Sequence, residues 1–286
     1  MNSLDPRLSP FRTDIAAEYL KGQVNSARFV AGENRTVFNG VADIRRLPVP
    51  DAPLDTEALH GEVFTVFEDS DEGWSWGQLG RDGYVGYMPS NALVTGIVEP
   101  THRVAVLRTF LYGGPSIKLP PVKPLSLGSR VNVKDFKGKF ALTSSGGFII
   151  ADHLAPIYQF DSDYVAVAER FLGIPYYWGG KTSLGLDCSA LVQVSLDAVG
   201  ISVLRDTDMQ ERSIGLEMSL DETEGNLTRG DLIFWKGHVG IMQNDATLLH
   251  SSGHQMLVVS EPLLEARERI LANGGGMITS IRRLSR

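Results

Sequence analysis

The sequence is poor in cysteine, because its 286 residues contain only one, Cys188. A single thiol cannot form a disulfide within the chain, and it cannot build a metal site that needs several cysteines. Two interpretations remain: Cys188 is either a buried apolar side chain or a nucleophile. The residues around it must decide between the two.

Three further absences narrow the class of protein. No stretch approaches the roughly 20 apolar residues that a membrane-spanning helix needs, so we expect no membrane partner. The net charge of −7 argues against a partner made of nucleic acid, because nucleic-acid-binding proteins usually carry a basic patch. The first residues lack a basic start followed by an apolar run, which predicts a cytoplasmic protein whose thiol stays reduced.

The chain is long enough for two or three modules. Residues 14–24 carry apolar side chains at helical spacing, which predicts a short helix within an N-terminal segment of residues 1–40. The next residues form short alternating runs broken by Gly, Pro, Asp and Ser, a pattern typical of small antiparallel β-barrels. These runs fall into two similar copies, residues 41–98 and 99–158, which indicates an internal duplication.

Residues 159–286 predict a different architecture. Helical spacing covers residues 164–172 and 188–199, and Gly200 is placed to end the second helix. Helices followed by antiparallel strands are typical of an α+β domain. The strand-like runs of this part are residues 231–235, 238–242 and 246–250.

The setting of Cys188 favours the nucleophile. A cysteine in the first turn of a helix has its pKa lowered by the helix dipole and by unpaired backbone N–H groups. Asp187 directly precedes it and is suited to cap that helix. A nucleophilic thiol also needs an imidazole, and His238 opens a predicted strand beside small residues. His250 ends the next predicted strand, and a hairpin would bring it beside His238 to orient it.

Zinc binding is the competing interpretation of Cys188, His238 and His250. Catalytic zinc sites commonly have three protein ligands, and these residue types are suitable. The long separation of Cys188 from the two histidines argues against zinc. We therefore expect neither a metal nor a cofactor.

Several ordered motifs in the last 125 or so residues resemble the NlpC-type cell-wall cysteine peptidases, a papain-like family. One departure is Ala190, where glycine usually follows the serine of the nucleophile motif. The matching motifs are Pro-Tyr-Tyr-Trp-Gly-Gly at 175–180, Asp-Cys-Ser at 187–189, Arg-Asp-Thr at 205–207, Gly-Asp-Leu-Ile-Phe at 230–234, His-Val-Gly-Ile at 238–241 and Leu-His-Ser at 249–251.

The residues before that part resemble bacterial SH3-like domains. The first copy matches the motif of these domains, a Gly-Trp strand followed by a Gly-Tyr-Val-like strand, with Gly73-Trp74 and the Gly-Tyr-Val-Gly-Tyr run at 83–87. The second copy has no tryptophan and matches poorly. The resemblance implies a papain-like α+β peptidase domain preceded by two small SH3-like barrels.

The resemblance also implies roles for individual residues. Cys188 would be the nucleophile, His238 the general base and then acid, and His250 the orienting residue. The oxyanion would be held by the Cys188 backbone N–H and the Tyr176 hydroxyl. For Tyr176 the alternative is packing within its loop.

Four other residues beside the predicted cleft are expected to contact substrate. Asp187 and Ser189 flank the nucleophile, although helix capping alone would also explain Asp187. Trp178 belongs to the glycine-rich loop, where core packing is the alternative, and Arg205 opens the Arg-Asp-Thr segment.

The substrate implied by the resemblance is the amide between γ-D-glutamate and a diamino acid in peptidoglycan stem peptides. SH3-like modules ahead of the peptidase resemble members that cleave free muropeptides with an unblocked L-Ala. We expect Glu68, Asp69 and Tyr84 to bind that ammonium, although each acid alone fits a solvated loop. In the cytoplasm such an enzyme would recycle imported wall fragments.

Two other functions stay open at this point. The same papain-like core also suits an acyltransferase or an amidase with another substrate. Alternatively, the SH3-like modules dominate and the protein is a non-catalytic adaptor that binds wall peptides. The sequence makes no prediction of the oligomeric state.

Overall fold

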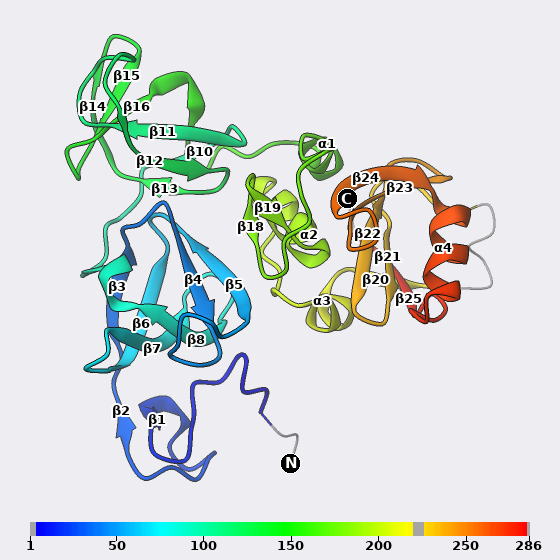
Figure 1. Cartoon of the computed structure of the whole chain (residues 1–286), viewed down its shortest axis with the longest axis horizontal. Coiled ribbons are helices and arrows are strands. Elements are labelled where there is room, and N and C mark those ends of the chain that lie inside the picture. Colours follow the sequence, from blue (N-terminus) through cyan, green and yellow to red (C-terminus); the bar gives the residue numbers. More distant parts are fainter. Residues whose placement is uncertain (1–3, 220–225, 285–286) are drawn as a thin grey trace. The chain divides into compact units, whose positions relative to one another are not determined.

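A computed structural model describes residues 4–219 and 226–284 of the chain. The chain divides into two units, Met1–Gln159 and Phe160–Arg286. This division lies beside residue 159, where the sequence predicts the start of the peptidase domain. The described part of the first unit consists of strands and short 3₁₀ helices, whereas the second combines α-helices with a sheet (Figure 1).

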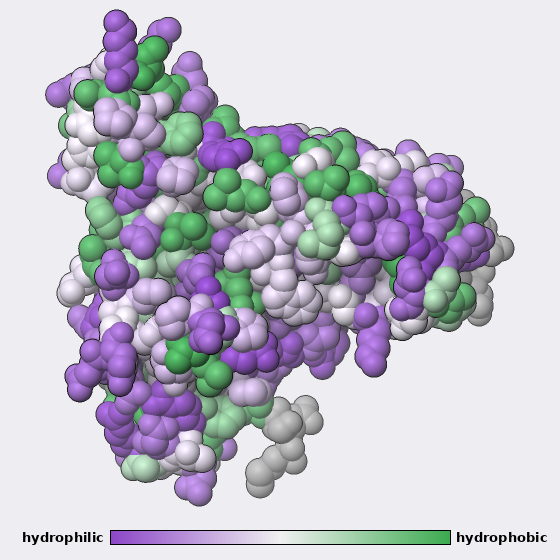
Figure 2. Space-filling view, viewed as in Figure 1, coloured by the Kyte–Doolittle hydropathy of each residue, from purple (hydrophilic) through white to green (hydrophobic). Residues whose placement is uncertain are grey.

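The predicted helix over residues 14–24 is wrong. This segment instead forms β1 (Ala16–Ala17) and the 3₁₀ helix η1 (Glu18–Leu20), and β1 pairs in parallel with β2 (Phe29–Val30). Ile15 and both residues of β1 are fully buried, so an extended backbone buries part of the apolar set that suggested a helix, whereas Tyr19 is exposed. A helix of this length is marginal on its own, so tertiary packing decides its conformation. Hydrophilic residues gather over the N-terminal segment in Figure 2.

The first β-module is one seven-stranded sheet in the order β5-β4-β8-β7-β6-β3-β9. Buried and half-exposed residues alternate along β4 and β8, as expected when one face of a strand packs on a core. Strand β3 belongs to this sheet, although the sequence placed it in the N-terminal segment of residues 1–40. The elements are β3 (Glu33–Val37), β4 (Val41–Arg45), β5 (Leu54–Leu59), β6 (Val63–Asp69), β7 (Trp74–Leu79), β8 (Val85–Pro89), η2 (Ser90–Ala92) and β9 (Leu93–Thr95).

The second β-module has a three-stranded sheet, β13-β10-β17, and a five-stranded sheet, β12-β11-β16-β15-β14. Its pairing repeats that of the first module. Strand β10 pairs with β13 and β17 as β3 does with β6 and β9, and β11 lies between β12 and β16 as β4 does between β5 and β8. This repetition agrees with an internal duplication. The elements are β10 (His102–Val104), β11 (Arg108–Tyr112), β12 (Pro121–Ser126), β13 (Arg130–Val131), β14 (Val133–Lys137), β15 (Phe140–Thr143), β16 (Phe148–Ile150), η3 (Ala151–His153) and β17 (Leu154–Pro156).

The second unit is an α+β domain, as predicted. Its antiparallel sheet has the order β20-β25-β21-β22-β23-β24, with α2 against one side and α4 against the other (Figure 1). The helices are α1 (Tyr164–Glu169), α2 (Cys188–Ala198), α3 (Thr207–Ser213) and α4 (Leu263–Ala272). The strands are β18 (Lys181–Thr182), β19 (Gly185–Leu186), β20 (Leu216–Met218), β21 (Leu232–Trp235), β22 (His238–Met242), β23 (Thr247–Ser252), β24 (Leu257–Pro262) and β25 (Ser280–Arg283).

Helix α2 is buried on nearly every side, which holds its N-terminus in place. All of its residues are buried except Asp197, and it packs against β22 and β23. Within the described residues, no helix is long and apolar enough to cross a membrane. The core on the α4 side of the sheet is formed by Ile233, Trp235, Met242, Leu248, Ala266 and Ile281.

Candidate active site

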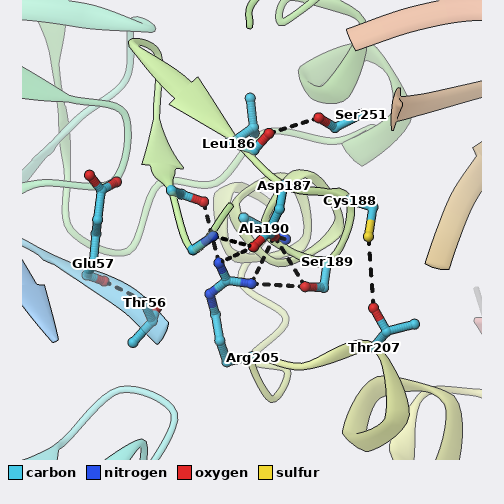
Figure 3. Close-up of polar contacts among 12 residues, drawn as sticks. Thr56, Glu57, Leu186, Asp187, Cys188, Ser189, Ala190, Arg205, Thr207 and Ser251 are labelled. Atoms are coloured by element: carbon cyan, nitrogen blue, oxygen red, sulfur yellow. Dashed lines mark hydrogen bonds and ion pairs between the residues drawn. The ribbon is translucent and has the colours of Figure 1, made fainter. Parts of the chain in front are cut away.

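Cys188 is the first residue of α2, as the sequence predicts. Asp187 is the N-cap, and its carboxylate accepts a hydrogen bond of 2.9 Å from the Ala190 N–H. The Cys188 Sγ lies 3.8 Å from the Thr207 hydroxyl (Figure 3) and 4.0 Å from the Gly237 carbonyl oxygen. Only 6% of the residue is exposed, so the thiol lies in a nearly dry environment.

The sequence predicts that the helix terminus lowers the pKa of Cys188, but in the structure this pKa is raised. Burial, assisted by the charge of Asp187, raises its pKa to about 11, although the Val239 N–H, Thr207 and Arg205 act in the opposite direction. The resting group is therefore a thiol that needs a base. Because Sγ interacts with the backbone of Gly237 and Val239, it lies against the strand that carries His238.

His238 and His250 lie side by side on neighbouring strands, β22 and β23. The His238 Nε2 is 2.7 Å from the His250 Nδ1, and the two rings meet edge to face at 72°. A side chain at Gly240 would come within 2.6 Å of Leu248, so this glycine lets the strands approach closely. The predicted hairpin arrangement is therefore present.

The ring of His238 is uncharged at neutral pH. Burial lowers its pKa to about 3, and the charges of His250 and Arg269 add to this effect, whereas Glu261 opposes it. An uncharged imidazole can accept a proton from a neighbouring thiol. His238 is therefore in the protonation state that a base for Cys188 requires.

A carboxylate and an arginine behind His250 were not predicted from the sequence. Glu261, on β24, lies 2.6 Å from the His250 Nε2, and Arg269, on α4, donates to Glu261 over 2.6 Å. Burial opposes the ionisation of Glu261, but hydrogen bonds from His250 and Arg269 outweigh it and lower its pKa to about 2. No local sequence pattern marks this contact, because it depends on how β24 and α4 pack beside β23.

Asp187, Ser189 and Arg205 form a buried network, which argues against the prediction that they contact substrate. Arg205 is 1% exposed and reaches both carboxylate oxygens of Asp187, at 2.9 and 2.7 Å, as well as the Ser189 hydroxyl at 2.8 Å (Figure 3). The Asp187 carboxylate also accepts from the Gly179 N–H. These polar groups are occupied within the protein, so they support the loop and the helix that carry Cys188.

Tyr176 and Trp178 lie in the glycine-rich loop before α2. Tyr176 is half-buried, and its backbone N–H donates to the Met256 carbonyl over 2.9 Å. Burial, with the nearby Cys188 and Asp187, raises the pKa of Tyr176, so its hydroxyl keeps the proton that an oxyanion would need. Trp178 is 63% exposed, which rules out core packing and leaves its ring free to meet a ligand.

The acids expected to bind an ammonium group are already paired within the first unit. Glu68 forms ion pairs with Arg12 and Arg28, and Asp69 accepts from Arg35 at 2.6 Å. These arginines neutralise both charges, which argues against the predicted role. Tyr84 is buried and does not present an open surface.

The zinc interpretation finds no support in the geometry. His250 lies four residues before His254, a spacing that can hold zinc, but its ring nitrogens are engaged by His238 and Glu261. Within residues 4–219 and 226–284, no group of three or more His, Cys, Asp or Glu side chains is arranged to hold a metal ion.

A cavity of about 190 Å³ adjoins the two histidines. It offers space beside the side chain of His238 for part of a ligand. Its lining residues are His238, His250, Ser252, Gly253, His254, Arg269, Ile270, Asn273 and Gly275.

Comparisons with known families match two parts of the chain. Residues 173–267 match the NlpC/P60 family, and residues 44–93 match the bacterial dipeptidyl-peptidase SH3 domain. The second unit therefore contains an NlpC/P60 family domain, which supports a hydrolase. The first β-module is an SH3 domain, whereas the second β-module lies outside both matches.

Two named relatives span most of the chain. A γ-D-glutamyl-L-lysine dipeptidyl-peptidase of Bacillus cereus is 28% identical over 244 residues, covering 73% of this chain and 71% of the relative. Dipeptidyl-peptidase 6 of Lysinibacillus sphaericus is 24% identical, covering 77% and 88%. The crystal structure of an NlpC/P60 family protein from Bacillus cereus has a TM-score of 0.72 at 22% identity, covering 87% of this chain and 99% of that one. This last similarity shows the fold.

Proposed function

We propose that the protein is a cysteine peptidase that hydrolyses the bond between γ-D-glutamate and a diamino acid in peptidoglycan-derived peptides. The observation that carries the proposal is the buried thiol of Cys188 against the strand of His238, with His250 bonded to His238 at 2.7 Å. This arrangement supports the roles of Cys188 as nucleophile, His238 as base and His250 as orienting group.

The first half of the reaction forms an acyl-enzyme. The Cys188 Sγ attacks the γ-carbonyl carbon while its proton passes to His238. The negative charge that develops on the carbonyl oxygen is stabilised by the Cys188 backbone N–H and the Tyr176 hydroxyl. That N–H lies in the first turn of α2, where backbone donors have no acceptor within the helix. The carbon–nitrogen bond then breaks, and His238 gives its proton to the leaving amine.

The second half releases the product and restores the enzyme. Water attacks the thioester carbon while His238 takes one of its protons. Collapse of the tetrahedral intermediate breaks the carbon–sulfur bond, and the proton on His238 returns to Sγ. The net result is a free γ-carboxylate, a free amine and an unchanged Cys188.

The names of the relatives support the class of substrate. A dipeptidyl-peptidase releases two residues from a free N-terminus, so its substrate must carry an unblocked amine. Applied to this chain, that activity releases L-Ala-γ-D-Glu from muropeptides with a free L-Ala. Such peptides arise when the wall is degraded, so the proposed role is the recycling of wall fragments in the cytoplasm.

The test uses purified protein and synthetic peptides. Incubation with L-Ala-γ-D-Glu-diaminopimelate, and in parallel with the L-lysine peptide, should release L-Ala-γ-D-Glu, detected by mass spectrometry. Cys188→Ala should abolish the release of this dipeptide. An N-acetylated peptide should be cut far more slowly, and equal rates would refute the preference for a free amine. If neither free peptide is cut, the proposed substrate is wrong.

Two alternatives predict other results in the same assay. An acyltransferase would pass the acyl group from Cys188 to an added amine such as glycine in preference to water, and an amidase of another specificity would leave both peptides intact. A non-catalytic adaptor would bind the peptide equally well with and without Cys188→Ala and would release no product.

A further inference from the structure

The carboxylate of Glu261 stands directly behind the His238–His250 pair. We propose that Glu261 is a positioning residue that sets which nitrogen of each histidine carries a proton, and so leaves Nδ1 of His238 as the basic atom. The inference rests on the proposed function in one respect, namely that His238 is the base for Cys188.

The contacts form an unbroken chain from α4 to β22. The His238 Nε2 lies 2.7 Å from the His250 Nδ1, and the His250 Nε2 lies 2.6 Å from a carboxylate oxygen of Glu261. Arg269 donates to both oxygens of that carboxylate. The side chain of Glu261 is only 11% exposed, so water competes little for these hydrogen bonds.

The direction of each hydrogen bond follows from the far end of this chain. An ionised carboxylate can only accept, so the His250 Nε2 must donate to Glu261. A neutral imidazole that donates from one nitrogen accepts at the other, so the His250 Nδ1 accepts from the His238 Nε2. The remaining nitrogen of His238, Nδ1, then carries the lone pair. Without an acceptor at position 261, the His250 Nδ1 could instead donate to the His238 Nε2. The proton of His238 would then lie on Nδ1, which could no longer accept one from Cys188.

The charge of Glu261 also supports the step that activates the thiol. When Cys188 transfers its proton, His238 becomes positively charged, and a nearby negative charge stabilises that state. The other charged or titratable groups around the pair are Cys188 on α2, Arg269 on α4 and His254 in the cavity beside both rings. Among these groups, Glu261 is the carboxylate hydrogen-bonded to the pair.

A glutamine cannot reproduce all the hydrogen bonds of Glu261, because His250 and Arg269 Nη2 donate to one carboxylate oxygen and Arg269 Nη1 donates to the other. Glu261 accepts from His250 and from Arg269, whereas a glutamine has one acceptor and one donor end. Its NH₂ group would face either the arginine or His250. Glu261→Gln therefore removes the charge and leaves at least one of these three hydrogen bonds without an acceptor.

The experiment measures the reactivity of Cys188 itself, which is possible because the chain has no other cysteine. The rate of alkylation by iodoacetamide is followed between pH 5 and pH 10 for the full-length protein and for Glu261→Gln. At pH 7 the variant should react at least about tenfold more slowly, as expected when the proton affinity of the base falls by one pKa unit. Glu261→Asp, which keeps the charge, should lose less reactivity than Glu261→Gln.

A matched control separates positioning from folding. Glu169 lies in the same unit and accepts from Arg229 at 2.8 Å and from Gln243 at 2.9 Å, away from the histidines. Glu169→Gln should leave the alkylation profile unchanged. The inference is wrong if Glu261→Gln has the profile of the unmodified protein, or if Glu169→Gln slows alkylation as much.

A second measurement needs no variant and stays informative if Glu261→Gln does not fold. Nitrogen-15 NMR of the histidine rings in the unmodified protein should show both His238 and His250 protonated at Nε2 and unprotonated at Nδ1. The opposite tautomer at either ring would overturn the inference. Neither measurement requires a peptide, so a protein that passes both tests but cleaves no γ-D-glutamyl bond refutes the proposed substrate alone.

Discussion

Arg205 Nη1 and Nη2 lie 2.9 and 2.7 Å from the two carboxylate oxygens of Asp187, the residue directly before Cys188. The pair is buried, and the same carboxylate caps the Ala190 N–H. One arginine thus holds the N-cap of α2 and, through it, the position of the thiol. The position of Cys188 therefore depends on an interaction that does not involve the sulfur atom.

Removing this arginine should destabilise the second unit strongly. Arg205→Ala leaves the Asp187 carboxylate buried without its partner, a change that typically costs about 3–5 kcal/mol. Urea unfolding, followed by tryptophan fluorescence, measures the loss. Arg229→Ala breaks the exposed pairs with Asp163 and Glu169 and should cost at most about 1 kcal/mol. Equal losses for the two variants would contradict a structural role for Arg205.

The stability of the protein should decrease above pH 9. The pKa of Cys188 is raised from 9.0 to about 11, so the folded state retains a proton that the unfolded chain releases. This stabilisation is complete below pH 9 and is lost as the pH rises through about 11. Urea unfolding at pH 8 and pH 10.5 should show a smaller decrease for Cys188→Ala than for the unmodified protein. Parallel decreases would mean that the thiol is not responsible.

Stability should also decrease on the acid side. The pKa of His238 is lowered from 6.5 to about 3, so the unfolded chain binds a proton that the folded state excludes. This contribution is complete above pH 6.5 and declines as the pH falls towards 3, and the contribution of Glu261 declines between pH 4.5 and about 2. Urea unfolding should show that the free energy of unfolding decreases less between pH 6.5 and pH 4 for His238→Gln than for the unmodified protein.

Neutralising the acids of the first unit should not change the preference for a free amine. Glu68 and Asp69 are paired with arginines, so Glu68→Gln and Asp69→Asn should leave the KM of L-Ala-γ-D-Glu peptides within about threefold. The ratio of rates for free and N-acetylated peptides is the readout. If either variant cleaved free and N-acetylated peptides at equal rates, the result would support the sequence-based prediction that these acids bind the ammonium group.

Trp178 should act on binding and not on folding. Because most of its ring is exposed, Trp178→Ala should change the free energy of unfolding by no more than about 0.5 kcal/mol. If the ring contacts substrate, KM should rise while kcat stays nearly constant. Steady-state kinetics with the preferred peptide would show this split, and an unchanged KM would exclude contact with that peptide.

The predicted nucleophile position and histidine hairpin depended on local patterns. The cap at Asp187, the helical spacing after Cys188 and the alternation around His238 and His250 are properties of a few neighbouring residues. The elements that these patterns predict are present as α2, β22 and β23, with small differences in their end residues. The helix predicted over residues 14–24 was wrong, because there the neighbours in space decided the backbone conformation.

The sequence by itself determined which groups can react, in which order they stand along the chain, and which elements carry them. Only the tertiary structure decided which partner each charged group takes: Arg205 for Asp187, Glu261 for His250, and arginines for Glu68. It also decided that burial outweighs the helix terminus in the pKa of Cys188. The physical reason is that desolvation and ion pairing depend on distances of a few ångströms between residues that are far apart in the sequence.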